Sequence, residues 1–110
     1  MRIQFLGKGG TTGGGCPSLY ATDADTYLAQ GWRTDTPEVV EIPHLLLGFV
    51  LPDTYIGTTM RDTNRGTFLL TGVPVTAPEV LAQMEIYPDE TVVEVPRMKR
   101  EFYGHAASAG

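Results

Sequence analysis

Cysteine and histidine are scarce in this chain of 110 residues, which contains one Cys and two His. The single thiol, Cys16, excludes an internal disulfide and is typical of a reducing compartment such as the cytoplasm. With only His44 and His105 available, Cys16 lacks the partners that a nucleophilic thiol or a structural zinc ion requires. We therefore expect no catalytic residue, no metal site and no cofactor, and a protein that is not an enzyme.

Positive charge is scarce as well. Lys and Arg number 8 against 13 Asp and Glu, which gives a net charge of −5. Because nonspecific nucleic-acid affinity comes from clustered cations, we expect no direct contact with nucleic acid. The one basic run, Arg97–Arg100, is interpreted as a solvated segment. No stretch reaches the roughly 18 apolar residues of a membrane-spanning helix, so we expect a cytoplasmic protein with no membrane partner.

The glycine-rich segment 7–15 follows a predicted strand and includes Lys8. A phosphate-binding loop would need a Ser or Thr directly after the lysine and a helix behind the loop. Here a glycine follows the lysine, and Cys16 and Pro17 lead into another predicted strand. We therefore interpret 7–15 as a flexible loop, and the small, polar segment 105–110 as a flexible tail.

Two parts of the chain resemble each other. Residues 26–31 (TYLAQG) align with 67–72 (TFLLTG), and 39–43 (VVEIP) align with 92–96 (VVEVP). Such repetition is typical of one supersecondary unit used twice, in which each copy buries an apolar face that it cannot cover alone. Because this length suits one compact core, we predict a single domain, 1–110, shared by both repeats.

Each repeat, about 16–46 and about 58–99, begins with a predicted β-hairpin. The expected strands are 18–22 with 26–32 in the first repeat and 58–61 with 67–73 in the second. Turn-forming residues separate the strands, with Asp23–Asp25 in the first hairpin and Asp62–Gly66 in the second. The two hairpins are therefore expected to be equivalent elements.

After the hairpin the repeats differ. In the second, Thr76, Pro78 and Glu79 favour the start of a helix, which we predict over 77–85. In the first, the segment 34–38 leaves room for no more than a turn. Each repeat then closes with a strand that ends at a proline, which has no amide to donate.

The predicted fold class is α+β, mostly β. We expect an internally duplicated hairpin–(helix)–strand unit that forms one small antiparallel β domain, with about six or seven strands and one short helix. Its core is expected to draw on Leu19, Tyr27, Leu28, Val40, Ile42, Phe68, Leu69, Val80, Leu81, Val93 and Val95. Two carboxylates at equivalent strand positions, Glu41 and Glu94, are expected on the solvent face.

The most apolar stretch lies between the repeats, at 44–52. It is interpreted either as a central strand or short helix of a monomeric core, or as a segment buried against a second subunit. Trp32 has the same two interpretations, a buried side chain or an exposed binding anchor. The candidate partner-binding residues are therefore Trp32, Leu45, Leu47, Phe49 and Leu51. Open strand edges also make a homodimer plausible.

Four stretches carry a resemblance to a known group: 16–23, 26–32, 77–83 and 90–96. Together they resemble small uncharacterised actinobacterial proteins that are encoded beside helix-turn-helix regulators. Typical members look like one hairpin, helix and strand unit, and this chain looks like two. In setting, and loosely in sequence, these proteins look similar to the BldB type, which is associated with helix-turn-helix regulators of the WhiJ type.

The resemblance implies a partner role. We expect a non-enzymatic accessory protein that binds a protein, with a helix-turn-helix transcription regulator as the leading candidate partner. An acidic domain suits a protein partner better than DNA. Two other classes stay open, namely a structural or self-assembling subunit of the particle or phage type, and a small ligand-binding domain.

Overall fold

The computed structural model describes residues 1–9 and 16–101. The segment 10–15 of the predicted flexible loop and the predicted tail at 105–110 lie outside the described residues. In chain order the elements are β1 (Ile3–Lys8), β2 (Ser18–Thr22), β3 (Thr26–Arg33), β4 (Val39–Pro43), the 3₁₀ helix η1 (His44–Phe49), β5 (Thr54–Ile56), β6 (Met60–Asp62), β7 (Thr67–Thr71), β8 (Val73–Pro74), α1 (Pro78–Leu81) and β9 (Glu90–Lys99).

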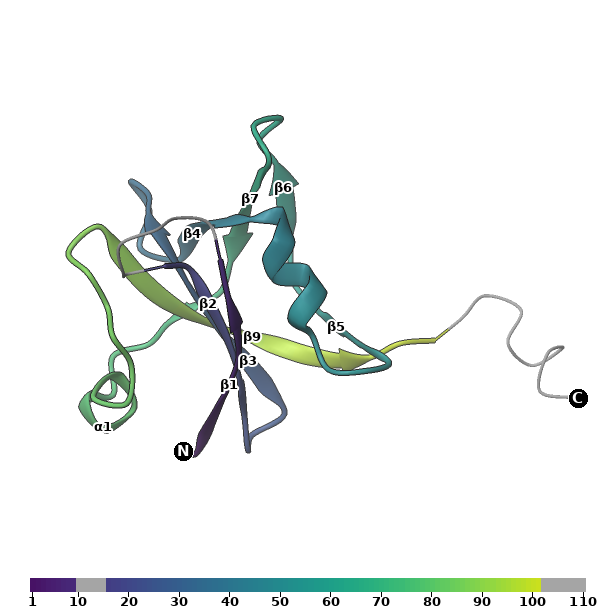
Figure 1. The fold of residues 1–110 in the computed structure, drawn as a ribbon, viewed down its shortest axis with the longest axis horizontal. Helices are drawn as coiled ribbons and strands as arrows, with labels where there is room; N and C mark the ends of the chain where they lie inside the picture. Colours follow the sequence, from purple (N-terminus) through teal and green to yellow (C-terminus); the bar gives the residue numbers. More distant parts are fainter. Residues whose placement is uncertain (10–15, 102–110) are drawn as a thin grey trace, which may run out of the picture.

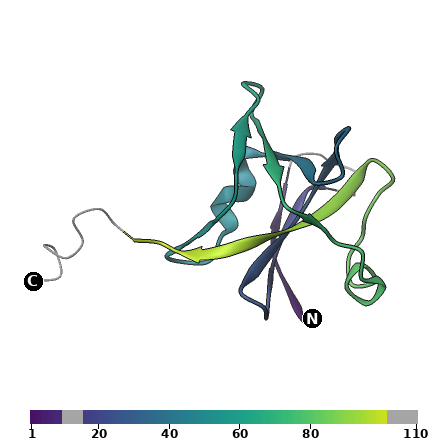
Figure 2. The same cartoon turned by 180° about the vertical axis from the view of Figure 1, so that it is seen from behind.

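The protein is a small β-rich domain built on an open antiparallel sheet with few helices (Figure 1). Along the sheet the strands follow the order β1-β2-β3-β4-β7-β6. β9 pairs along β3 and also with the short strands β5 and β8. Seen from behind, β9 crosses the centre of the molecule, with β6 and β7 above it and α1 to one side (Figure 2).

The first hairpin has the predicted strands, β2 and β3, joined at Asp23–Asp25. In the second hairpin, β6 and β7 flank the turn 63–66, and β8 follows after a break at Gly72. Positive φ occurs at Asp25 (59°) and at Gly66 (87°), the last residue of each turn. Asp and Gly both tolerate this left-handed backbone, which explains why turn chemistry located both hairpins correctly.

Four local predictions need correction. Pro96 does not end its strand, because β9 continues to Lys99 and pairs with β5 there. The helix predicted over 77–85 is shorter, Pro78–Leu81, because the chain turns away and the carbonyl of Glu85 accepts a hydrogen bond of 2.6 Å from Gln30 Nε2. Gly7 and Lys8, predicted to be loop, extend β1, which pairs with β2 through an irregularity between Phe5 and Gly7. The described residues form nine strands, because short segments such as β5 and β8 add to the main ones.

Two hydrophobic clusters lie on the two faces of β3, as the alternation of side chains along a strand requires. Tyr27 and Ala29 belong to the first cluster, which the buried Leu46 of η1 joins. Leu28 belongs to the second, which Val80 of α1 joins. Figure 1 accordingly shows η1 and α1 well apart, with the sheet between them.

Most of the predicted core is buried. Fully or almost fully buried are Leu19, Tyr27, Leu28, Val40, Ile42, Val80, Val93 and Val95. Phe68, Leu69 and Leu81 are only partly buried. Leu46 is buried as well, which fits the interpretation of 44–52 as a short helix of the core. The predicted core did not name Ile56, Leu70 and Val92, which are also buried. Ile56 lies between the repeats, where no alignment pointed to a buried position.

Candidate binding surfaces

The apolar stretch 44–52 contributes to the core and to the surface. It forms η1, whose Leu46 is buried, while Leu45 is 48% exposed. Leu47, Phe49 and Leu51 are partly buried and pack against the first cluster. Of the candidate contact residues in this stretch, Leu45 presents the largest exposed fraction.

Two glycines of the β1 region make this packing possible. A Cβ at Gly7 would collide with the ring of Phe49, and a Cβ at Gly9 would collide with the side chain of Leu45. The glycines of the predicted loop therefore allow β1 to approach η1. Gly7 and Gly9 thus serve close packing, a role that the sequence pattern did not suggest.

Trp32 lies at the end of β3, where it is cross-strand partner to Glu41 of β4 and to Glu90 of β9. Its side chain is half-buried. By strand alternation it shares a face with Leu28, the face that α1 covers, whereas η1 packs on the opposite face. The candidate residues Trp32 and Leu45 thus belong to two separate surfaces.

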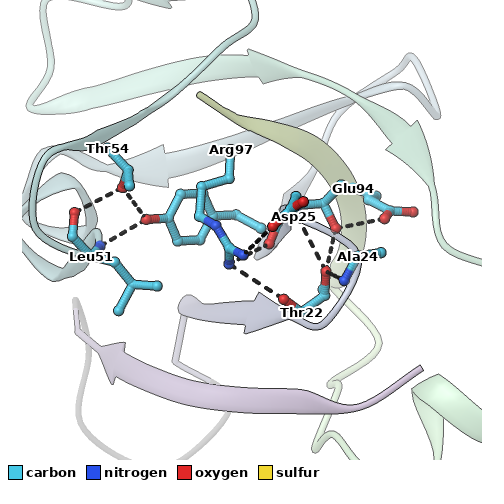
Figure 3. Close-up of polar contacts among 9 residues, drawn as sticks. Thr22, Ala24, Asp25, Leu51, Thr54, Glu94 and Arg97 are labelled. Atoms are coloured by element: carbon cyan, nitrogen blue, oxygen red, sulfur yellow. Dashed lines mark hydrogen bonds and ion pairs between the residues drawn. The ribbon is translucent and has the colours of Figure 1, made fainter. Parts of the chain in front are cut away.

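A polar network fixes the end of η1 to the first hairpin (Figure 3). The hydroxyl of Tyr27, a fully buried residue, accepts a hydrogen bond of 2.7 Å from the backbone N–H of Leu51 and shares a second one with the Thr54 hydroxyl. The guanidinium of Arg97 lies 5.6 Å from the centre of the Tyr27 ring. The network therefore links β3, β9 and the segment after η1.

Arg97 also closes the first turn. Its guanidinium donates to the carbonyls of Thr22 (3.4 Å) and Thr26 (3.3 Å) and pairs with Asp25 at 3.1 Å. Figure 3 shows the guanidinium directed at Thr22 and Asp25. The interpretation of Arg97–Arg100 as a solvated segment is therefore wrong for Arg97, whose side chain is largely buried and pairs with Asp25.

The second hairpin has a matching arrangement. His44, which aligns with Arg97, stacks on the ring of Phe68, which aligns with Tyr27, at 4.0 Å between centroids. The backbone N–H of His44 donates to Gly66, and the N–H of Arg97 donates to the aligned Asp25. The same positions therefore make the same kinds of contact in both halves.

Both predicted surface carboxylates are half-buried and bound by threonine. Thr26 donates to Glu94 at 2.7 Å, and Thr67 donates to Glu41 at 2.6 Å. Arg65 also pairs with Glu41 at 3.0 Å. The Thr67 hydrogen bond, with Arg65 adding to it, holds the pKa of Glu41 below its ordinary value. The two glutamates therefore stabilise the hairpins.

A buried polar pair lies beneath the segment after α1. Gln30 and Glu90 are both buried, and Gln30 Nε2 donates to Glu90 Oε1 at 2.8 Å. The backbone N–H of Tyr87 donates to the same oxygen at 3.1 Å. Gln30 Oε1 and Glu90 Oε2 have no hydrogen-bond partner among the described residues. The pair anchors the start of β9 against the segment after α1.

A groove of about 360 Å³ lies on the outer face of β7. Leu69 and Arg61, cross-strand partners in β7 and β6, line it together with Val39 of β4. The loop that precedes β4 completes the lining with Thr34, Asp35 and Thr36, and Thr59 and Thr71 lie at its margin. Sequence reasoning missed this groove, because it assigned Leu69 to the core.

The corresponding face of the other half is covered. Tyr20 and Leu28 are cross-strand partners in β2 and β3, in the same register as Arg61 and Leu69. Val80 of α1 is 3% exposed and belongs to one cluster with them. One feature of the sequence could have indicated the uncovered face. A helix is predicted over 77–85, whereas the corresponding segment 34–38 leaves room for only a turn.

Three comparisons with known proteins gave no relatives: no family model matches the chain, and neither the curated proteins nor the solved structures contain a match. Within residues 1–9 and 16–101, His, Cys, Asp and Glu side chains form no group of three that could hold a metal ion. In that same part of the chain, no helix has the length and apolar character needed to cross a membrane.

Proposed function

We propose that the chain is a tandem duplication in which the two halves exchange their closing strands. The first hairpin pairs with β9, from the second repeat, through Thr26↔Pro96 and Leu28↔Glu94. The second hairpin pairs with β4, from the first repeat, and its aligned residues have aligned partners: Thr67↔Pro43 and Leu69↔Glu41. This agreement of register along the whole of both pairings supports the proposal.

The glycines support the same relationship. A Cβ at Gly31 would lie 2.5 Å from the carbonyl oxygen of Glu41, and a Cβ at Gly72 would lie 2.7 Å from that of Glu94. Gly31 aligns with Gly72, and Glu41 aligns with Glu94. Both copies therefore need glycine where the hairpin strand passes closest to a closing strand.

On this basis we infer that the protein is a non-enzymatic accessory protein that binds a protein partner, with a helix-turn-helix transcription regulator as the leading candidate. The observation that carries the inference is the uncovered groove at Leu69, on a face whose counterpart at Leu28 is filled by α1. An apolar position beside a cation and an anion, Arg61 and Asp35, suits a protein surface with both apolar and charged groups. We place the protein in the cytoplasm, in line with its single cysteine.

Affinity capture tests this function. The tagged chain is expressed in cells of its source, and co-purifying proteins are identified by mass spectrometry. Capture is repeated with Leu69→Lys in the groove, with Trp32→Ala and Leu45→Lys on the two other candidate surfaces, and with Val73→Lys, at a residue that is 67% exposed, as the control. A stoichiometric regulator that Leu69→Lys loses and Val73→Lys retains supports the proposal.

A self-assembling subunit is the second candidate, favoured by the short edge strand β6, which pairs only with β7 in the described part of the sheet. It predicts recovery of the chain by itself and oligomers that grow with concentration. Sedimentation over a range of concentrations separates this function from partner binding, which predicts a defined complex. Recovery of particle components in the capture would likewise favour this second function.

A further inference from the structure

The two outer faces differ in what covers them. The connection from the second hairpin to β9 contains α1, whose Val80 lies in one cluster with Leu28 of the first hairpin and Val92 of β9. The connection from the first hairpin to β4, which pairs with β7, is the short loop 34–38. The chain therefore shows that a short amphipathic helix can cover one such face, and it leaves the aligned face open at Leu69.

We propose that the groove at Leu69 binds an amphipathic helical segment of the partner protein, seated on β7 as α1 is seated on β3. This inference rests on the proposed function and specifies the chemistry of its partner. The helix presents one aliphatic side chain to Leu69, as Val80 of α1 does to Leu28. Helix-in-groove binding of this kind depends on a few apolar anchors spaced along one face of the helix.

Charge further specifies the segment. Arg61 takes the register position of Tyr20 and lines the groove beside Leu69, and its side chain forms no hydrogen bond or ion pair with any described residue. An acidic side chain next to the aliphatic anchor of the bound segment therefore complements Arg61.

The strongest alternative occupant of the groove is a second copy of the chain. Its own α1, however, is engaged, because Val80 is buried against Leu28 within the same chain. If two copies exchanged α1, each copy would uncover the face at Leu28 in order to cover the face at Leu69. A helix supplied by a different protein covers the open face without that loss.

The test begins by supplying the missing helix. In a graft variant, residues 75–91 of the chain replace residues 34–38, so that the same helical connection precedes β4. A linked segment samples the groove at a high effective concentration, which overcomes the weak helicity of so short a peptide. The matched control is the same graft with lysine at the position that corresponds to Val80.

If the groove accepts a helix, the graft raises Tm by about 5 °C over the control graft. Nuclear Overhauser effects then appear between the Leu69 methyl groups and the grafted valine. Equal Tm values for the two grafts, with no such contacts at Leu69, would overturn the inference. If neither graft folds, the inference is tested instead by titrating the unaltered, isotope-labelled chain with a synthetic peptide of residues 75–87. Amide shifts at Leu69 and Thr71 that Leu69→Lys abolishes then support the inference, and their absence overturns it.

Capture with the graft variant separates this inference from the function on which it rests. If the graft no longer captures the protein that the unaltered chain and the control graft both capture, the groove is the site of binding. If both capture it equally, the inference fails and the protein-binding function stands. If the unaltered chain captures only itself and the graft alone is monomeric, the occupant is a second copy, and both proposals are overturned.

Discussion

The hydroxyl of Thr67 donates a hydrogen bond of 2.6 Å to the carboxylate of Glu41, which joins the second hairpin to β4. Thr26 and Glu94, at the aligned positions, make the same contact at 2.7 Å between the first hairpin and β9. Each threonine also shares a hydrogen bond of 2.6 Å with a second threonine across its turn, Thr63 or Thr22. Hairpin and closing strand are therefore held together by the same side chains at both places.

Glu41→Gln is expected to make stability less dependent on acidic pH. The pKa of Glu41 in the folded protein lies below its ordinary value of 4.5, so its carboxylate stabilises the fold above that pH and loses the contribution as the pH falls through the lowered value. We expect Glu41→Gln to cost about 0.5–1.5 kcal/mol near pH 7, and the difference to shrink as the pH falls below 4.5 and through the lowered pKa of Glu41.

Urea unfolding at a series of pH values measures this difference. The control is Glu38→Gln, at an exposed glutamate on the loop before β4. A cost for Glu41→Gln that is constant from neutral to acidic pH would show that the carboxylate charge does not contribute.

Gly31→Ala is expected to destabilise the protein, because the new Cβ would lie 2.5 Å from the carbonyl oxygen of Glu41 and 2.8 Å from the Ile42 side chain. Backbone must move to relieve this contact, at a cost of about 1–3 kcal/mol. Gly48→Ala is the matched control, since a Cβ there meets no atom within 4 Å. Thermal unfolding should show a marked drop in Tm for the first variant alone, and similar Tm values would contradict the close approach.

Tyr27→Phe is expected to cost about 1–2 kcal/mol, because it leaves the partly buried N–H of Leu51 without its acceptor. The aromatic packing with Arg97 is retained. Tyr55→Phe removes the same hydroxyl from an exposed side chain and should change the free energy of unfolding by less than about 0.5 kcal/mol. Amide hydrogen exchange should increase at Leu51 in the first variant, and unchanged exchange there would argue against the hydrogen bond.

Leu70→Ala and Leu69→Ala are expected to differ sharply although the residues are neighbours. Leu70 is fully buried in the first cluster, so its truncation leaves a cavity and costs about 2–5 kcal/mol. Leu69 is only partly buried and lines the groove, and its truncation should cost about 1 kcal/mol or less. Equal losses in chemical denaturation would place Leu69 in a packed core and remove the open groove.

The hairpins were predictable because the signals for them are local. Ser18–Thr22 and Thr26–Arg33 combine alternation with a turn, and Asp25 can adopt the positive φ that this turn requires. The closing strands were recognisable from their Val-Val-Glu pattern for the same reason. The helix was located correctly at its start but not at its end, because Gln30, distant in sequence, binds the carbonyl of Glu85.

The candidate sites were less predictable. Leu45, Leu47, Phe49 and Leu51 form a continuous apolar run, and only the position of η1 on the first cluster decides that Leu46 is buried while Leu45 is exposed. The groove at Leu69 could be predicted even less well, because its lining comes from three strands and two loops that are separated in the chain.

Local sequence sets where the chain turns and which segments form the main strands, since backbone preference and side-chain alternation act between near neighbours. Which strand each hairpin pairs with depends on long-range packing. Val39–Pro43 and Glu90–Lys99 present nearly the same Val-Val-Glu pattern, so the pattern cannot choose between them. The choice follows from packing both hairpins around one core, which places β9 on β3 and β4 on β7 and leaves one outer face uncovered.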